Sequence, residues 1–206
     1  MTDINRRNLM VTSAAGALSA LFVTSVAQAQ AQAQDKPLSP LQWTDQFGLI
    51  KDLPKDKDPL TDELKKYPRC RYCGMERAKF THSRHLIVYE DDAVDSTCSL
   101  HCAAIGLSIS VDRGPKAIYA GDAGAEAELK PLVNVDKATY VVDPSKPGVM
   151  SKVSVLAYAD KAKAVAKAGS QAEAVGFDQA LRKAYQLMAD DTIMARQRRG
   201  EMRKKM

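Results

Sequence analysis

The spacing of hydrophobic positions predicts an order of strands and helices that occurs twice along the chain. In its first occurrence, an apolar β-rich run is followed by a short return strand, a stretch with apolar residues at helical spacing and a further strand. These segments are residues 85–89, 93–97, 100–109 and 116–120. Ser99 is a suitable N-cap for the helix, and the segment Asp112–Pro115 ends it. The first unit is therefore predicted to be β-β-α-β.

The same order is predicted again further along, although the two halves share little sequence. Strands are expected at residues 138–142 and 153–158, a helix at 160–168 and a third strand at 172–177. A C-terminal helix follows Asp178, with apolar residues at helical spacing: Ala180, Leu181, Ala184, Leu187 and Met188. The predicted fold class is α+β, with two small β-β-α-β modules and a C-terminal helix.

Composition indicates what surrounds these modules. Residues 34–68 are rich in proline and charge, and they are predicted to be either an extended leader with one helical turn near residues 60–66 or a disordered linker. Trp43 is the candidate to attach this leader to the body. The predicted organisation is a signal segment (1–33), the leader (34–68), a first, metal-binding module (69–121), a second module with the C-terminal helix (130–190) and a basic tail (191–206).

The first residues have the features of an export signal. Arg6-Arg7 precedes a mildly apolar stretch from Val11 to Ala27, and Ala-Gln repeats then offer small residues for cleavage. The paired arginines and the low hydrophobicity resemble a twin-arginine signal. The protein is thus expected in the periplasm, and no later segment is expected to cross a bilayer. In that oxidising compartment, cysteines should be disulfides, metal ligands or redox-active thiols.

The formal net charge is +5, and much of the excess lies in the tail, which holds Arg196, Arg198, Arg199, Arg203, Lys204 and Lys205 against Glu201. The body lacks a basic face with aromatic partners, so no nucleic-acid partner is expected. The tail is interpreted as a solvated end with at most weak electrostatic contact to an anionic membrane. No Ser-His-Asp arrangement, phosphate loop or paired acid and base stands out, so the chain is not predicted to be an enzyme.

All four cysteines lie in two close pairs, Cys70-Arg-Tyr-Cys73-Gly-Met75 and Cys98-Ser-Leu-His101-Cys102. A turn can aim both sulfurs of the first pair at one point, and one helical turn can do so for the second pair. All three histidines lie in or near the same window: His82, His85 and His101. Thiolate, thioether and imidazole ligands favour Cu(I) or Zn(II) over Mg or Ca. The candidate ligands are Cys70, Cys73, Met75, Cys98, His101 and Cys102.

Three interpretations of this window stay open. The first is a Cu(I) site that uses a subset of the soft ligands, and the second is structural zinc held by four cysteines or by three and a histidine. The third is disulfides, for which four cysteines allow three connectivities. A thiol oxidoreductase is disfavoured because the first pair precedes a hairpin and not a helix. The sequence does not choose a ligand among the three histidines.

Five stretches keep their order over residues 68–190 and together resemble the NosL family. They are Cys70–Met75, Leu86–Asp91, Asn134–Val142, Pro147–Met150 and Ala157–Ala168. NosL proteins are nitrous-oxide-reductase accessory proteins that bind copper outside the cytoplasm. The resemblance implies two small β-β-α-β modules and a Cu(I) ion that Cys, Met and His hold and that passes to a metal-acceptor protein in the periplasm. It carries over to Cys73 and Met75 of the Cys-Gly-Met element.

The chain departs from typical NosL proteins in two respects, and it therefore resembles a divergent branch. Typical members carry a lipidated cysteine at the mature N-terminus, whereas no cysteine precedes Cys70, so an anchor of that kind is not expected. They also lack the Cys98–Cys102 segment, which makes this candidate site richer in sulfur. The predicted function is an exported copper chaperone, with nitrous oxide reductase maturation as one destination. The alternative is a protein-interaction module that zinc or disulfides stabilise.

Overall fold

The computed structural model describes residues 38–168 and 170–205. The predicted signal segment, residues 1–33, lies outside these residues. The chain divides into two units within helix α2 (Pro40–Phe47), and the residues from Trp43 onward form one compact unit. Among the helices of the described ranges, none is long and apolar enough to cross a membrane.

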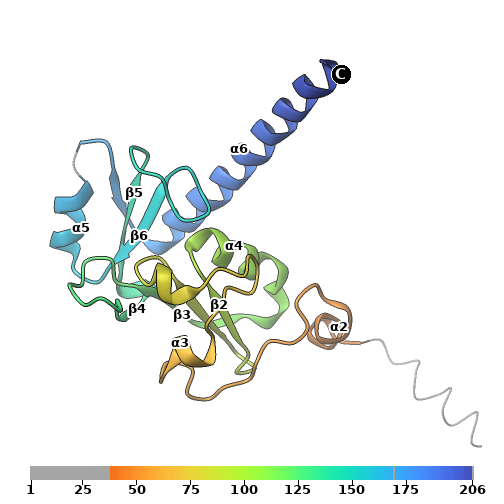
Figure 1. Cartoon of the computed structure of the whole chain (residues 1–206). Coiled ribbons are helices and arrows are strands. Elements are labelled where there is room, and N and C mark those ends of the chain that lie inside the picture. The colour runs from red at the N-terminus through yellow and green to blue at the C-terminus, as the bar shows by residue number, and fades with distance from the viewer. Residues whose placement is uncertain (1–37, 169, 206) are drawn as a thin grey trace, which may run out of the picture. The chain divides into compact units, whose positions relative to one another are not determined.

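The first module is an antiparallel sheet with one helix (Figure 1). Strands β1 (His85–Tyr89) and β2 (Val94–Thr97) form a hairpin, α4 (Leu100–Ile109) follows, and β3 (Pro115–Gly121) returns antiparallel to β1. Strand β4 (Leu132–Asn134) pairs with β3, so the sheet order is β2-β1-β3-β4. The segment of β4 was expected to begin the second module, but its backbone hydrogen bonds join it to the first sheet.

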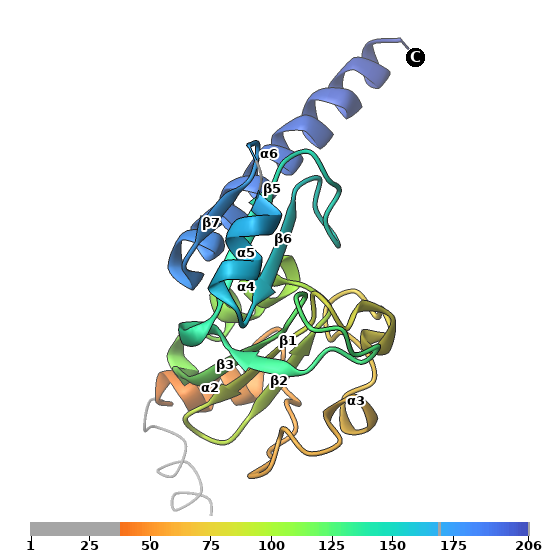
Figure 2. The same cartoon turned by 90° about the vertical axis from the view of Figure 1, so that its left-hand side faces the viewer.

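The second module repeats this arrangement with a smaller sheet. Strands β5 (Thr139–Asp143) and β6 (Ser154–Tyr158) form a hairpin, α5 (Lys161–Ala168) follows, and β7 (Glu173–Val175) pairs antiparallel with β5. In both modules, the strand after the helix lies beside the first strand of the hairpin, on the side away from the second (Figure 2). The predicted α+β class, with its repeated β-β-α-β order, is therefore confirmed.

Residues 53–67 pack against the first module and are not a separate leader. Leu53, Glu63 and Tyr67 are buried, and α3 (Glu63–Lys66) is the helical turn that the sequence predicted. Short 3-10 helices follow elsewhere in the unit: η2 (Arg77–Phe80), η3 (Val111–Arg113) and η4 (Val135–Lys137). The expected role of Trp43 is not observed, because 54% of its surface is exposed.

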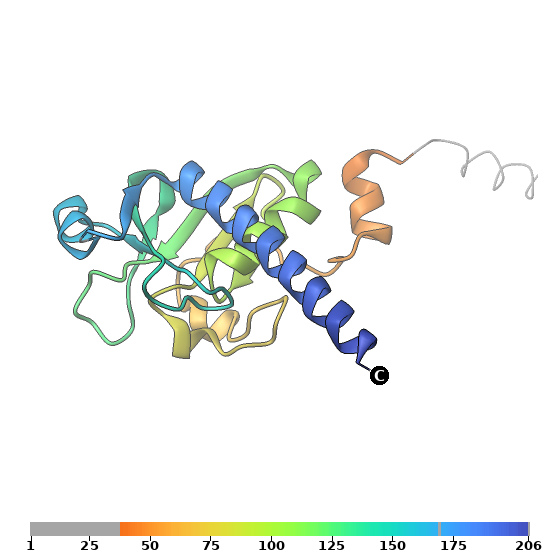
Figure 3. The ribbon, with the colours of Figure 1, turned by 90° about the horizontal axis from the view of Figure 1, so that it is seen from above.

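The C-terminal helix α6 (Phe177–Lys204) is 28 residues long and includes most of the segment predicted to be a basic tail. Its first half packs on α4, where the Tyr185 hydroxyl donates to the carbonyl oxygen of Ala104 over 2.9 Å. Its second half leaves the modules and continues as a regular helix (Figure 3). Basic residues suit the last turns of a helix because they compensate the negative end of its dipole.

One hydrophobic core runs through both modules, and His85 joins them within it. The core contains Ile87, Tyr89, Leu100, Ala103, Ile118, Val135, Tyr140, Ala157, Ala180 and Ala184. The His85 Nδ1–H group donates to the carbonyl oxygen of Ser83 over 2.9 Å, so Nε2 accepts from the Tyr140 hydroxyl at 3.0 Å. Burial lowers the pKa of His85 to about 4, and the positive charges of Arg77 and Arg84 act in the same direction. The neutral imidazole is thus part of the fold.

Acidification should weaken the fold through His85. The imidazole titrates near 6.5 in an unfolded chain and near 4 in the folded one, so its stabilising contribution is present above about pH 6.5. It is lost as the pH falls toward 4, by up to about 3 kcal/mol in the free energy of unfolding. Urea denaturation across this range measures the effect. His85→Gln should flatten the pH dependence and His82→Gln should largely keep it; equal slopes for wild type and His85→Gln would contradict this assignment.

Candidate metal centre

The first cysteine pair lies in a tight turn that the backbone closes. The Cys70 N–H donates to the carbonyl oxygen of Met75 over 2.9 Å, and the Gly74 N–H donates to that of Cys70 over 3.0 Å. Gly74 has a φ of 74°, a left-handed conformation that glycine adopts without strain. The turn therefore requires the glycine of the Cys-x-x-Cys-Gly element, and it brings the side chains of Cys70 and Cys73 to one side.

The second pair spans the beginning of α4. Cys98 immediately precedes the N-cap residue Ser99, and Cys102 lies in the first turn, so one helical turn places their Sγ atoms 3.8 Å apart. Ser99 is the N-cap as predicted, but its side chain makes no capping hydrogen bond. Its carbonyl oxygen instead accepts from the N–H of Ala103.

The fold brings all four cysteines to one point, where their Sγ atoms lie within 4.8 Å of one another. The Sγ of Cys73 is 3.4 Å from that of Cys98 and 3.9 Å from that of Cys102. None of the four forms a disulfide. Metal–sulfur bonds of about 2.3 Å in a tetrahedron set sulfur atoms about 3.8 Å apart. The spacing therefore fits a single soft metal ion at the centre of the four sulfurs.

The sulfur cluster is a small apolar cluster of its own, separate from the main core. Cys70, Cys98 and Cys102 are buried and Cys73 is half-buried. Apolar side chains pack against it: Tyr72, Met75, Phe80 and Val149. Val149 belongs to the β5–β6 loop, so the second module forms one wall of a site whose four sulfurs all come from the first.

Groups around Cys70 lower the pKa of its thiol. The neighbouring thiols of Cys102 and Cys98 have the largest effect, and the backbone N–H groups of Cys73 and Tyr72 add to it. The interactions with Cys70 and Cys98, together with burial, in turn raise the pKa of Cys102. Cysteine thiols must lose their protons to act as metal ligands. A cation that binds here must release those protons, which makes its affinity increase with pH.

Arg77 fixes the two cysteine segments relative to each other, a role that the sequence did not reveal. Its side chain is fully buried and donates to the carbonyl oxygens of Tyr67, Thr97 and His85 over 2.7, 3.2 and 3.2 Å. Thr97 directly precedes Cys98, and Tyr67 lies shortly before Cys70. The guanidinium thus bonds to the backbone close to both cysteine pairs.

Glu63 completes this buried network from α3. Its carboxylate pairs with Arg77 over 2.7 Å and with Arg84 over 2.7 Å. Ser83 adds a further hold on the second pair, because its hydroxyl donates to the carbonyl oxygen of Cys98 over 2.7 Å. The spacing of hydrophobic residues in the sequence does not indicate such buried charged residues, because charged side chains are rarely expected in the interior.

A second contact joins the first cysteine turn to the sheet and to α4. The Tyr72 hydroxyl donates to Asp95, a fully buried residue of β2. Burial raises the pKa of Asp95 to about 6, while the Tyr72 hydrogen bond opposes the shift. Gly106 of α4 leaves room for this pair, because a Cβ atom there would lie 2.4 Å from Asp95 Oδ2. A glycine inside a helix is the one sequence signal that could have indicated this close approach.

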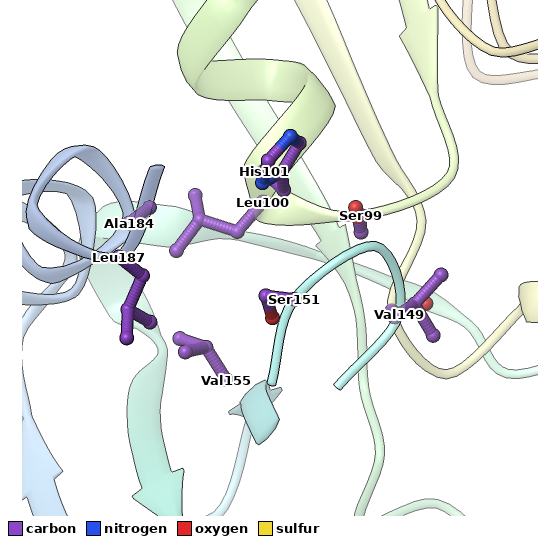
Figure 4. A pocket seen from close by; sticks show the side chains of 9 residues that line it. Ser99, Leu100, His101, Val149, Ser151, Val155, Ala184 and Leu187 are labelled. Atoms are coloured by element: carbon purple, nitrogen blue, oxygen red, sulfur yellow. The ribbon is translucent and has the colours of Figure 1, made fainter. Parts of the chain in front are cut away.

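The structure separates the three histidines from one another. His85 is part of the core, and His82 lines a different cavity together with Asp143 and Lys146. His101 lies on α4 and lines a small cavity with residues of the β5–β6 loop and of α6, among them Val149, Ser151, Ala184 and Leu187 (Figure 4). Among the described residues, the group of potential ligand atoms contains the four cysteines and no histidine. Met75 packs on the cluster, whereas coordination by His101 stays a prediction.

The family comparison agrees with the position of this centre. The NosL family model matches residues 61–179, which is more than half of the chain. The chain belongs to the NosL family. The matched range contains all four cysteines and all elements from α3 to the first residues of α6. The Cys-Gly-Met element of this NosL protein is therefore the turn described above.

Solved structures include a similar protein. The crystal structure of the copper chaperone NosL from Shewanella denitrificans is similar to this NosL protein with a TM-score of 0.44 and 21% sequence identity. The similarity covers 61% of this chain and 95% of that chain. No curated protein matches the sequence.

Replacing Gly106 should disturb the metal centre from a distance. The added Cβ of Gly106→Ala would clash with the Asp95 carboxylate and the Tyr72 hydroxyl, so these side chains must move, and Tyr72 belongs to the cysteine turn. We expect a loss of about 1–3 kcal/mol in the free energy of unfolding and weaker metal binding. Denaturation and metal titration measure both quantities.

Gly200→Ala is the matched control, because no atom lies within 4 Å of the position of its Cβ. It should leave metal binding unchanged and stabilise α6 by up to about 1 kcal/mol. Unaltered metal binding in Gly106→Ala would show that the contact between Tyr72 and Asp95 does not position the cysteine turn.

Proposed function

We propose that this protein is an exported copper chaperone that holds one Cu(I) ion at a subset of Cys70, Cys73, Cys98 and Cys102, completed by the thioether of Met75, and passes it to a metal-acceptor protein. The observation that carries the proposal is the convergence of four Sγ atoms within 4.8 Å in a member of the NosL family. Soft thiolate ligands select Cu(I), Zn(II) or iron–sulfur clusters over hard cations. Membership of a copper-binding family favours the first of these.

Two features of the cluster favour copper over zinc. The side chain of Met75 packs on the sulfurs, and a thioether is a ligand for Cu(I) and not for the usual zinc sites. Cys73 is only half-buried, so one side of the site is open to a partner. An ion that must leave needs such an open side, whereas a structural ion is enclosed by its four ligands.

Transfer also requires that the protein stays folded when the ion leaves. The sulfur cluster is separate from the main core, which contains residues of both modules and of α6. The network of Arg77 and Glu63 holds the cysteine segments with side chains that do not depend on a metal. The metal-free protein should therefore keep its fold. This arrangement suits a carrier of copper.

Structural zinc is the second candidate. The sulfurs of Cys73, Cys98 and Cys102 are 3.4 to 3.9 Å apart and all four lie within 4.8 Å, which suits a tetrahedral four-cysteine site equally well. Under that alternative, the protein would be an interaction module that the metal stabilises. Export to the periplasm and delivery to a nitrous oxide reductase remain parts of the copper proposal, supported by the features of residues 1–33 and by the family.

Metal exchange under anaerobic conditions separates the two candidates. The reduced protein should take up one Cu(I) per chain in competition with a Cu(I) chelator, and the stripped protein should keep its circular dichroism spectrum and cooperative unfolding. Met75→Leu should weaken Cu(I) binding by about tenfold while leaving Zn(II) binding in place, because only Cu(I) uses the thioether. This swap nearly conserves volume and should cost little stability.

Met188→Leu is the control for the loss of a thioether, since Met188 packs on the main core and not on the sulfur cluster. It should bind both metals like the wild type. Failure of the reduced protein to take up Cu(I) would refute the copper proposal. Unfolding of the stripped protein would instead assign the site to structural zinc.

A further inference from the structure

The excess positive charge of this protein is concentrated at the C-terminal end of α6. The segment from Ala195 to Lys205 contains six basic residues and one acidic residue, which equals the net charge of +5 of the whole chain. Every residue of this segment apart from Gly200 is exposed. The helix continues here without contact to the modules (Figures 1 and 3). An isolated, strongly basic helix end is a surface that an acidic partner would recognise.

Three of the four arginines on this segment lie along one side of the helix. Arg196, Arg199 and Arg203 follow one another at intervals of three and four residues, so they form a stripe on one face. A guanidinium binds a carboxylate with two parallel hydrogen bonds, which a lysine cannot do. The stripe therefore fits a row of carboxylates at a similar spacing.

A protein surface suits this stripe better than a membrane does. A helix that lies in a bilayer interface needs a continuous apolar face opposite its basic face. The exposed apolar residues here are Ile193 and Met202, and nine residues, or about two and a half turns, separate them. They consequently lie on opposite sides of the helix and form no apolar face.

The loop that borders the metal centre also contacts α6 just before the stripe begins. Lys152 of the β5–β6 loop pairs with Asp191 over 3.8 Å and contacts the Met194 sulfur at 2.9 Å, which ties the helix to this loop where it leaves the body. Val149 of the same loop packs on the sulfur cluster. A partner that binds along the arginines would thus lie beside the loop that borders the four cysteines.

We infer that Arg196, Arg199 and Arg203 form a docking surface for an acidic protein and that this protein is the recipient of the metal. The second part rests on the proposed function, whereas the first does not. The surface would increase the rate of encounter and orient the recipient toward the half-buried Cys73.

Binding of a labelled acidic peptide to the full, metal-free chain tests the docking surface by itself. The probe is a helical peptide with glutamates at positions i, i+3 and i+7, compared with the same peptide carrying glutamines, at a low salt concentration of about 50 mM. The glutamate peptide should bind preferentially. A triple variant, Arg196→Gln with Arg199→Gln and Arg203→Gln, should weaken its binding by about tenfold.

The matched control removes three charges elsewhere. Lys161, Lys163 and Lys167 are exposed on α5, and replacing all three by glutamine should change binding by at most about twofold. An equal loss in both triple variants would overturn the proposal, since net charge alone would then explain binding. Binding to vesicles with anionic phospholipid in preference to the peptide would overturn it as well and would assign the stripe to a membrane.

Copper transfer tests whether the docked protein is a recipient. A peptide with a Cys-x-x-Cys acceptor joined to the glutamate helix should remove Cu(I) from the protein faster than the glutamine version, and the arginine triple variant should abolish this difference. Equal rates for both peptides would refute the role in delivery. Peptide binding in a protein that takes up no Cu(I) would keep the docking surface and refute the proposed function instead.

Discussion

The guanidinium of Arg77 is fully buried, and the geometry of the metal centre depends on the hydrogen bonds that it donates. The cysteines lie in a turn and at the start of a helix, two segments that share no continuous strand pairing. Arg77 bonds to carbonyl oxygens beside both segments, and Glu63 balances its charge. Breaking a buried pair of this kind costs about 3–5 kcal/mol, because it leaves an uncompensated charge in the interior. The protein therefore positions its thiols before any metal binds.

Under the proposed function, a site that is prepared in this way would release its ion without unfolding. The four sulfurs form a cluster apart from the main core, and Val149 from the second module covers one side while Cys73 stays half-exposed. Under the proposed function, a soft cation would bind four thiols at this spacing and displace their protons as it enters. The half-buried Cys73 and the thioether of Met75 would then distinguish a carrier from an enclosed structural site.

Much of the fold followed from the sequence because both modules are local in the chain. The spacing of apolar residues predicted β1, β2, α4 and β3 nearly to the residue, and the repeat in the second module as well. Two results could not be predicted from spacing. β4 joins the first sheet by pairing with β3, and α6 continues through a basic segment that does not pack against the core. The cysteines of the candidate site were likewise evident in the sequence. The roles of Arg77, Glu63 and Asp95 were not, because these side chains are buried and charged residue types are usually exposed.

The most direct test of the account is copper K-edge X-ray absorption spectroscopy on the protein loaded anaerobically with one Cu(I). We expect a Cu(I) edge with sulfur neighbours alone in the first shell, at about 2.2–2.3 Å. Cys98→Ser should lower the number of sulfur neighbours, since the Sγ of Cys98 lies 3.4 Å from that of Cys73 at the centre of the cluster. A first shell dominated by nitrogen or oxygen, or one that Cys98→Ser leaves unchanged, would contradict the assignment of the four cysteines as the copper site.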